Sequence, residues 1–180
     1  MAAKLRPFGT QIFASLSIRY ATLSKSENSE TEKHDTQFKK GRLAMAIFGS
    51  CLCGEIKFQI TGPMMEPFHC HCSRCRKQHG AAFRSRVRVK TIDLHWVHGE
   101  DKLKYYKSSP GFHRGFCNNC GSPIVNFAER LGEFGVPLGI LDDDPEVKPQ
   151  FHIFVGNKAP WFEIADDLPQ HEELPWPRRE

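Results

Sequence analysis

Cys117-Asn-Asn-Cys120-Gly121 is the segment of this 180-residue chain from which a fold can first be argued. Two cysteines separated by two residues can turn both sulfurs toward one metal ion, and a glycine directly after them supplies a tight backbone turn. The segment therefore indicates half of a structural zinc site. Cys51-Leu-Cys53 offers the two further thiolates that a closed, tetrahedral site requires. Together the four cysteines predict one structural zinc ion.

The three remaining cysteines form a compact cluster, Cys70-His-Cys72-Ser-Arg-Cys75. Three protein ligands with a fourth position for water or substrate are typical of catalytic zinc. Three thiolates outweigh the charge of the ion, and such a soft centre favours a substrate thiol over a hydrolytic hydroxide as its fourth ligand. Basic side chains nearby could offset the negative charge and hold the carboxylates of a substrate. They are Arg74, Arg76 and Lys77.

Two other arrangements of the cysteines remain open. In the first, one zinc ion is held by Cys72/Cys75 and Cys117/Cys120 in ribbon fashion, and the other three cysteines have no role. In the second, a nearby histidine closes the three-cysteine site and makes it purely structural. The candidates are His69, His71 and His79. Because seven is an odd number, a secreted disulfide framework that pairs every cysteine is excluded.

The first 45 residues differ in composition from the rest. Residues 1–45 carry eight Lys/Arg and four Asp/Glu, whereas residues 46–180 carry 17 of each, so the formal charge of +4 comes entirely from the first segment. We expect residues 1–45 to be a disordered or helical extension and residues 46–180 to form one domain. Residues 1–26 are basic, free of acids and amphipathic, which is typical of a mitochondrial transit peptide. The expected location is the cytoplasm, or the mitochondrial matrix if that segment is a transit peptide.

From residue 46 onward the patterns predict mostly strands. Glu55–Ile60 and Phe83–Lys90 alternate polar with apolar residues, and Phe151–Val155 is a short buried-strand candidate. A helix is expected only over Ser73–Ala82. The longest uncharged run near the start, Pro7–Ile18, has 12 residues and is too short to cross a bilayer. We therefore expect a largely β domain that does not span a membrane.

Other residues are weaker candidates for a functional role. One face of the strand predicted over 83–90 carries Arg84, Arg86, Arg88 and Lys90. This face could bind anions, but a charged strand face is more often solvated, and solvation is our expectation. His113 could be a general acid or base, although a lone histidine is more often structural or on the surface. Trp161 and Phe162 could close over a site, but core packing is the better default.

Four segments together resemble the glutathione-dependent formaldehyde-activating enzyme family, which also includes the domain of centromere protein V. They are Gly49-Ser-Cys-Leu-Cys-Gly-Glu-Ile56, His69-Cys-His-Cys-Ser-Arg-Cys-Arg-Lys-Gln-His-Gly-Ala81, Phe116-Cys-Asn-Asn-Cys-Gly-Ser-Pro-Ile124 and Lys158-Ala-Pro-Trp161. The resemblance covers about residues 48–175. It implies a small all-β fold of the Mss4-like (β-tent) kind with two zinc ions per chain. The structural ion is implied on Cys51, Cys53, Cys117 and Cys120, and the catalytic ion on Cys70, Cys72 and Cys75.

The resemblance also implies an activity. The family joins glutathione and formaldehyde to give S-hydroxymethylglutathione, a reaction classed under carbon–sulfur lyases. We therefore expect a zinc-dependent carbon–sulfur lyase-like enzyme that acts on adducts between a thiol, in the first place glutathione, and an aldehyde. The alternatives are a non-catalytic zinc module that binds nucleic acid or a protein partner, as in centromere protein V-like proteins, and a redox thiol switch. Nucleic acid is the less expected partner because residues 46–180 carry no net charge.

Overall fold

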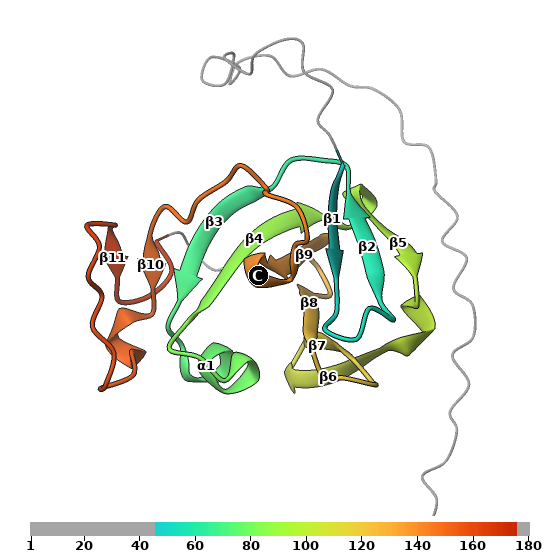
Figure 1. The fold of residues 1–180 in the computed structure, drawn as a ribbon. Helices are drawn as coiled ribbons and strands as arrows, with labels where there is room; N and C mark the ends of the chain where they lie inside the picture. The colour runs from blue at the N-terminus through green and yellow to red at the C-terminus, as the bar shows by residue number, and fades with distance from the viewer. Residues whose placement is uncertain (1–45, 176–180) are drawn as a thin grey trace, which may run out of the picture. The chain divides into compact units, whose positions relative to one another are not determined.

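A computed structural model of the chain describes residues 46–175 (Figure 1). The expected extension over residues 1–45, with its possible transit peptide, lies outside the described residues. Within them strands dominate, and α1 (Ser73–His79) is the one α-helix, so the all-β fold class is confirmed. No helix in the described range combines the length and the apolar character that a membrane span requires.

The smaller of two sheets has three antiparallel strands in the order β1-β2-β5. They span Ile47–Ser50, Lys57–Ile60 and Leu94–His98. Strand β2 alternates as predicted, with Phe58 and Ile60 buried. The strand predicted over Glu55–Ile60 is two residues too long, because its start belongs to a turn in which the Cys51 N–H donates to the Ile56 carbonyl over 3.0 Å.

The larger sheet has eight strands in the order β11-β10-β3-β4-β9-β8-β7-β6. In chain order they span Met65–Cys70 (β3), Arg84–Lys90 (β4), Leu103–Ser109 (β6), Phe112–Cys117 (β7), Pro123–Ala128 (β8), Glu133–Pro137 (β9), His152–Ile153 (β10) and Gln170–His171 (β11). Short 3-10 turns cover Thr91–Asp93, Glu100–Lys102, Leu138–Ile140 and Val155–Asn157. The strand predicted over Phe151–Val155 stops at Ile153, because Phe154 takes a φ of 57° and starts a turn.

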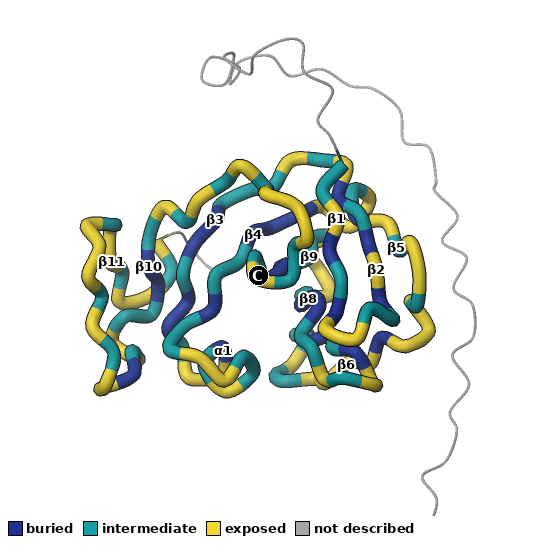
Figure 2. The backbone as a smooth tube through the Cα atoms, viewed as in Figure 1, coloured by how far each residue is buried: buried dark blue, intermediate teal, exposed yellow. Residues whose placement is uncertain are grey.

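The main hydrophobic core contains side chains from both sheets. Phe58 of β2, Val87 and Val89 of β4 and Val136 of β9 are completely buried in it. Figure 2 shows buried positions on both β2 and β4. Burial of each such side chain contributes roughly 1.5–3 kcal/mol. The alternation that the sequence displays therefore identifies which face of β4 turns toward the core.

The opposite face of β4 carries its basic side chains, and the expectation that these are solvated is wrong. Arg84 and Arg88 are only 3% and 7% exposed, and Arg86 is half-buried, whereas Lys90 at the strand end is exposed. These side chains contact neighbouring strands of the same sheet: Arg84 donates to the carbonyl of Gly135 on β9 over 2.8 Å, and Arg88 pairs with Glu66 on β3 and Glu133 on β9. The pattern of one strand does not reveal which groups its neighbours place beside it.

Candidate active site and metal centres

Four cysteine sulfurs from two distant segments meet beside the end of β7. Cys51 and Cys53 lie in the loop that follows β1. Cys117 is the last residue of β7, and Cys120 lies in the turn before β8. The four Sγ atoms lie within 4.8 Å of one another, with 3.4 Å between Cys51 and Cys53 and 3.8 Å between Cys53 and Cys117. Sulfurs bound about 2.3 Å from a tetrahedral zinc ion lie about 3.8 Å apart, so these four residues fit a closed zinc site.

A left-handed glycine follows each of these two cysteine pairs. Gly121 has a φ of 75° and donates its N–H to the Cys117 carbonyl over 2.9 Å. Gly54 has a φ of 76° and donates in the same way to the Cys51 carbonyl, also over 2.9 Å. A residue with a Cβ atom rarely adopts such a φ. The turn that the sequence predicted after Cys120 is therefore present, and the loop after β1 repeats it.

The second sulfur group is local to the junction of β3 and α1. Cys70 ends β3, Cys72 is the N-cap residue of α1, and Cys75 lies in its first turn. Their Sγ atoms lie within 4.8 Å of one another, and the Cys72 sulfur accepts the N–H of Cys75 over 3.4 Å. Cys70 and Cys75 are 5% and 6% exposed. The three residues therefore fit a buried site with three sulfur ligands, although zinc binding itself stays a prediction for both groups.

The electrostatics of this group favour a thiolate. The pKa of Cys75 lies far below the ordinary value because the Cys70 and Cys72 thiols can donate hydrogen bonds to its sulfur, and because Arg84 and Arg114 add positive charge nearby. The pKa of Cys70 is raised because its own proton is held in those hydrogen bonds. A ready thiolate is the form of cysteine that binds a metal ion.

The structure also decides between the alternative cysteine arrangements. Cys72 and Cys75 lie in one sulfur group and Cys117 and Cys120 in the other, so the ribbon arrangement with one shared ion is wrong. Within the described residues no histidine nitrogen joins either group at the same spacing. We therefore do not observe the predicted alternative in which His69, His71 or His79 supplies a fourth ligand to the three-cysteine site.

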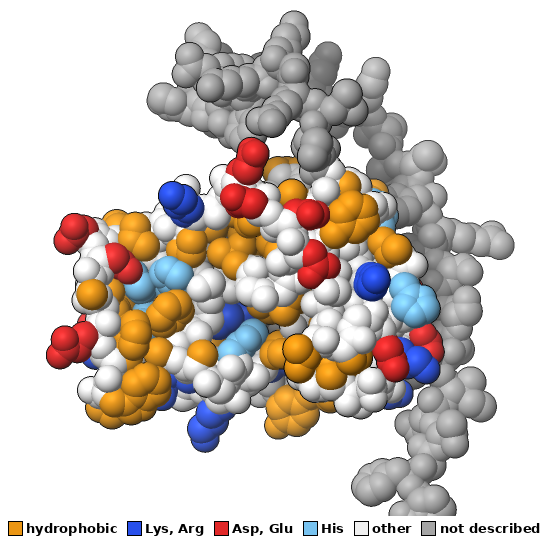
Figure 3. Space-filling view, in the orientation of Figure 1, with side chains coloured by type: hydrophobic (Ala, Val, Ile, Leu, Met, Phe, Trp, Pro, Cys, Tyr) orange, Lys and Arg blue, Asp and Glu red, His pale blue; other side chains and the backbone are white. Residues whose placement is uncertain are grey.

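One face of the large sheet is polar, and we call it the polar face. Arg88 lies opposite Gly135 of β9, Gly135 lies opposite Asn126 of β8, and Asn126 lies opposite Arg114 of β7, so these residues share one side of the sheet. The side chains of the polar face are Arg84, Arg86 and Arg88 of β4, Arg114 of β7 and Asn126 of β8. Cys70 is on the same side, opposite Arg84. In Figure 3 a Lys or Arg side chain and a His side chain show between the positions of β4 and α1. The three-sulfur group therefore lies beside a row of guanidinium groups.

The partners of these cations are mostly neutral. Arg84 donates to Asn126 Oδ1 and to the Gly135 carbonyl, and Arg114 donates to Ser108 Oγ over 3.0 Å and to Gln78 Oε1. Burial lowers the pKa of Arg84 to about 9, so the group stays charged at neutral pH. Arg88 is paired with Glu66 and Glu133, whereas Arg84, Arg86 and Arg114 have no carboxylate partner among the described residues, and such cations make this face attractive to anions.

A pocket of about 470 Å³ lies between α1 and strands β6 and β7. Arg74, Lys77 and Gln78 of α1 line it, together with Arg114 and Tyr106. Arg74 and Lys77 are two of the residues that the sequence suggested for holding carboxylates. The third, Arg76, does not line this pocket, and its Nε atom is buried without a hydrogen bond.

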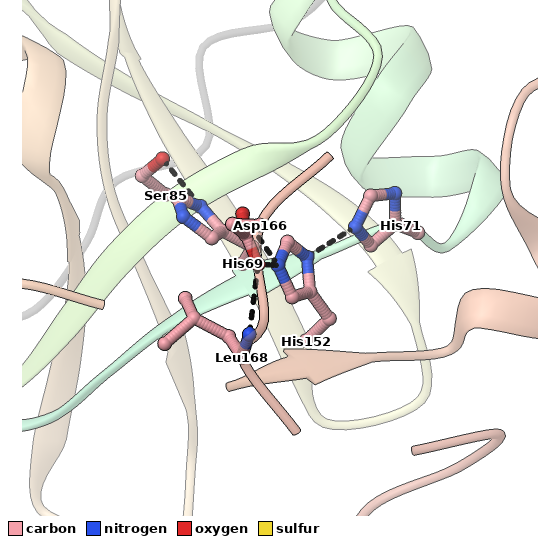
Figure 4. Close-up of polar contacts among 6 residues, drawn as sticks. All are labelled: His69, His71, Ser85, His152, Asp166 and Leu168. Carbon is pink, nitrogen blue, oxygen red and sulfur yellow. Dashed lines mark hydrogen bonds and ion pairs between the residues drawn. The ribbon is translucent and has the colours of Figure 1, made fainter. Parts of the chain in front are cut away.

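A chain of hydrogen bonds that the sequence did not reveal links His71 to Asp166 (Figure 4). His71 Nε2 lies 2.8 Å from His152 Nδ1, and His152 Nε2 lies 3.0 Å from Asp166 Oδ1. Because the carboxylate only accepts, His152 donates from Nε2 and accepts at Nδ1 from His71. This leaves His71 Nδ1 as an acceptor, and it is buried without a partner among the described residues. Burial, followed by the charge of His152, lowers the pKa of His71 to about 4.

The remaining candidates have smaller roles. His113 forms a hydrogen bond of 2.6 Å with Glu129 and stacks on Phe127, and it belongs to neither sulfur group. Trp161 is 71% exposed, and the expectation that it packs in the core is wrong. Phe162 packs against Phe83 at a ring distance of 5.3 Å and so borders the histidine chain.

The family match found by comparison with known sequences lies within the part of the chain that was predicted to form the domain. Residues 46–157 match the family described as glutathione-dependent formaldehyde-activating enzyme. The chain belongs to this family. A protein of Halomonas elongata with the same family description in its name is 33% identical over 129 residues, which are 67% of this chain and 82% of the relative. A similarly named protein of Phaeosphaeria nodorum is 30% identical over 130 residues, or 69% of this chain and 66% of that protein.

Membership of the formaldehyde-activating enzyme family supports an enzymatic role for the chain with glutathione and formaldehyde as reactants. A crystal structure of a Rhodobacter sphaeroides protein is 26% identical, with a TM-score of 0.46 over 54% of this chain and 91% of that one. The family match includes all seven cysteines and the polar face, whereas Asp166 lies beyond its end.

Proposed function

We propose that the chain is a zinc-dependent enzyme that forms and cleaves the carbon–sulfur bond of adducts between glutathione and an aldehyde such as formaldehyde. The observation that carries the proposal is the separation of seven cysteines into a group of four sulfurs and a group of three. Four thiolates would enclose a structural zinc ion, held by Cys51, Cys53, Cys117 and Cys120. Three thiolates, from Cys70, Cys72 and Cys75, leave one position for a substrate.

The reaction needs a sulfur nucleophile and a place for one proton. A zinc ion held by three thiolates supplies, when bound, a position at which a fourth sulfur is stabilised as its thiolate. The glutathione sulfur then bonds to the carbonyl carbon of the aldehyde. The π electron pair of the carbonyl moves to oxygen, and that oxygen takes up the proton that the thiol lost. Cleavage is the same path in reverse.

The residues around the three-sulfur group suit glutathione, whose carboxylates make it an anion. Arg74 and Lys77 on α1 and Arg114 on β7 converge on the pocket of about 470 Å³. Arg74 and Lys77 lie on the helix that contains Cys75, and Arg114 is near enough to lower the pKa of Cys75, so the pocket lies near the three-sulfur group. Charge-assisted hydrogen bonds to its carboxylates would orient glutathione with its sulfur toward that group.

We expect the chain to accelerate exchange between formaldehyde and S-hydroxymethylglutathione, measured by NMR exchange spectroscopy. Cys72→Ser should reduce this exchange to its uncatalysed rate, because the three-sulfur group is then incomplete. Ser73→Ala, a change at an exposed neighbour on the same helix, is the matched control and should leave the rate unchanged. Undiminished exchange in a folded Cys72→Ser protein would remove this sulfur group from the mechanism.

The alternative of a nucleic-acid module has less support. Phosphate backbones are bound by exposed basic side chains, but Arg84, Arg88 and Arg114 are buried. Residues 46–180 also carry equal numbers of basic and acidic residues. Retention of residues 46–180 on DNA that weakens with added salt would favour the alternative.

A further inference from the structure

A second pocket on the polar face has no role in the reaction as described so far. It has a volume of about 420 Å³ and lies among β4, β8 and β9, where Arg86, Asn126 and Gly135 contribute to its lining. Apolar side chains such as Phe112 and Leu131 form much of the remainder. A mostly apolar pocket with a few convergent polar groups is typical of a small-molecule site.

Arg86 is the charged group that this pocket presents without a carboxylate partner. Its guanidinium lies 4.5 Å from the centre of the buried Phe68 ring, and it makes no hydrogen bond or ion pair with the described residues. The neighbouring Arg88, in contrast, is paired with Glu66 and Glu133. A partly buried cation without a partner is costly. The Phe68 ring holds one face of the guanidinium, so its edge, with the N–H donors, remains for an anion.

Asn126 adds a neutral donor beside Arg86. Its side chain is 2% exposed, and its Oδ1 atom accepts a hydrogen bond from Arg84. The amide nitrogen, which carries two N–H groups, has no hydrogen-bond partner among the described residues. Because Arg84 fixes the oxygen of the amide, the orientation of the nitrogen is fixed as well.

Gly135 makes this arrangement sterically possible. A Cβ atom at position 135 would lie 2.3 Å from Arg86 Nη1 and 2.8 Å from Asn126 Oδ1, which is closer than atoms can approach. Its backbone φ is an ordinary one, so the close approach of the two side chains, and not the turn geometry, is what requires a glycine here. The pocket is therefore shaped around these two polar groups.

Counting the charges at the pocket supports an anionic occupant. The pocket is lined by two cations, Arg86 and Arg88, and by one carboxylate, Glu133. Glu133 and Glu66 both pair with Arg88, which leaves Arg86 as the lining cation without a carboxylate partner. We propose that this pocket binds a carboxylate through Arg86 and the amide nitrogen of Asn126. The inference rests on the proposed function, because the carboxylate would belong either to glutathione or to an aldehyde that carries its own carboxylate.

Calorimetric titration of the full metal-loaded chain with acetate tests the site itself. Acetate should bind, and acetamide, its uncharged analogue, should not. Arg86→Met should weaken acetate binding roughly tenfold or more, as expected for the loss of a charge-assisted hydrogen bond. Arg86→Lys should restore acetate binding only in part, because an ammonium cannot bind both oxygens side by side.

Lys90→Met, which removes one charge from the exposed end of the same strand, is the matched control and should bind acetate as the natural chain does. Absence of saturable acetate binding, or equal weakening in Lys90→Met, would overturn the proposal.

Kinetics then separate the two sources of the carboxylate. If it belongs to glutathione, Arg86→Met should raise the KM of glutathione about tenfold with formaldehyde as the second reactant. If it belongs to the aldehyde, the same variant should raise the KM of glyoxylate and leave those of formaldehyde and glutathione unchanged. Active enzyme in which neither KM changes would contradict a role of the pocket in the reaction. A chain without exchange activity whose acetate binding still depends on Arg86 would refute the proposed function and leave the carboxylate site standing.

Discussion

Two imidazoles lie at the ends of α1, one buried and one half-buried, and their protonation is set by their surroundings. His71 precedes the helix and is completely buried, and His79 is its last residue. Burial lowers the pKa of each from the ordinary 6.5 to about 4; for His79 the charge of Arg84 acts in the same direction. Both rings are therefore neutral at physiological pH.

We expect the ring signals of His71 and His79 in an NMR titration to stay constant from pH 7.5 to pH 5.5, where an imidazole with an ordinary pKa becomes mostly protonated. The unfolded chain takes up protons below about pH 6.5 that the folded chain refuses until about pH 4. The free energy of unfolding contributed by these groups is thus fully present above pH 6.5 and declines as the pH falls through this window. A midpoint near 6.5 for either ring would contradict the burial argument.

At the scale of single elements, α1 is a helix of seven residues that contains one of the three sulfurs of its group, on Cys75, and is capped by a second, on Cys72. So short a helix depends on its ends. Cys72 caps its start, and Gly80 ends it with a φ of 57° while donating its N–H to the Arg76 carbonyl. The end of the helix therefore needs a residue that tolerates left-handed backbone.

Gly80→Ala should lower the free energy of unfolding by about 1 kcal/mol, measured by urea denaturation. A Cβ atom at position 80 would meet nothing within 4 Å, so the cost arises from the backbone alone. Gly139→Ala is the matched control, because it also has open space around it but an ordinary φ. Equal effects of the two substitutions would show that the left-handed cap does not hold the helix.

At the scale of the whole described domain, the two sulfur groups differ in what they join. The four-sulfur group connects the loop after β1 of the small sheet with the β7–β8 turn of the large sheet. The three-sulfur group lies within a single short segment at the start of α1. Metal at the first site would therefore hold the domain together, whereas metal at the second would order mainly α1.

Stepwise chelation should consequently release one zinc ion with little change in circular dichroism and a second only as the domain unfolds. Cys72→Ser should stay folded with about half of the zinc of the natural chain. Cys120→Ser should fail to fold or lose most of its stability, since structural zinc contributes roughly 10–16 kcal/mol in small domains. Elemental analysis and thermal unfolding measure both effects. A folded Cys120→Ser protein of undiminished stability would refute a structural role for the four-sulfur group.

Short-range spacing was enough to predict that cysteines close in sequence bring their sulfurs together, and to predict the core face of β4. A pair such as Cys117 and Cys120 brings its sulfurs together through a few backbone bonds, and the alternation around Val87 and Val89 follows from strand geometry alone. Which pair completes which site was open, because the sequence allowed Cys117 and Cys120 to join either Cys51/Cys53 or Cys72/Cys75.

Three features were decided by the tertiary structure alone. They are the pairing of Cys117 and Cys120 with Cys51 and Cys53, the burial of the arginines of β4, and the hydrogen-bond chain from His71 through His152 to Asp166. His71 and His152 lie 81 residues apart and meet only because β10 pairs with β3. Arg84 is buried because Asn126 and Gly135 arrive from strands formed later in the chain. Contacts of this kind depend on strand pairing between distant segments, and no local pattern of residue types records which strands will pair.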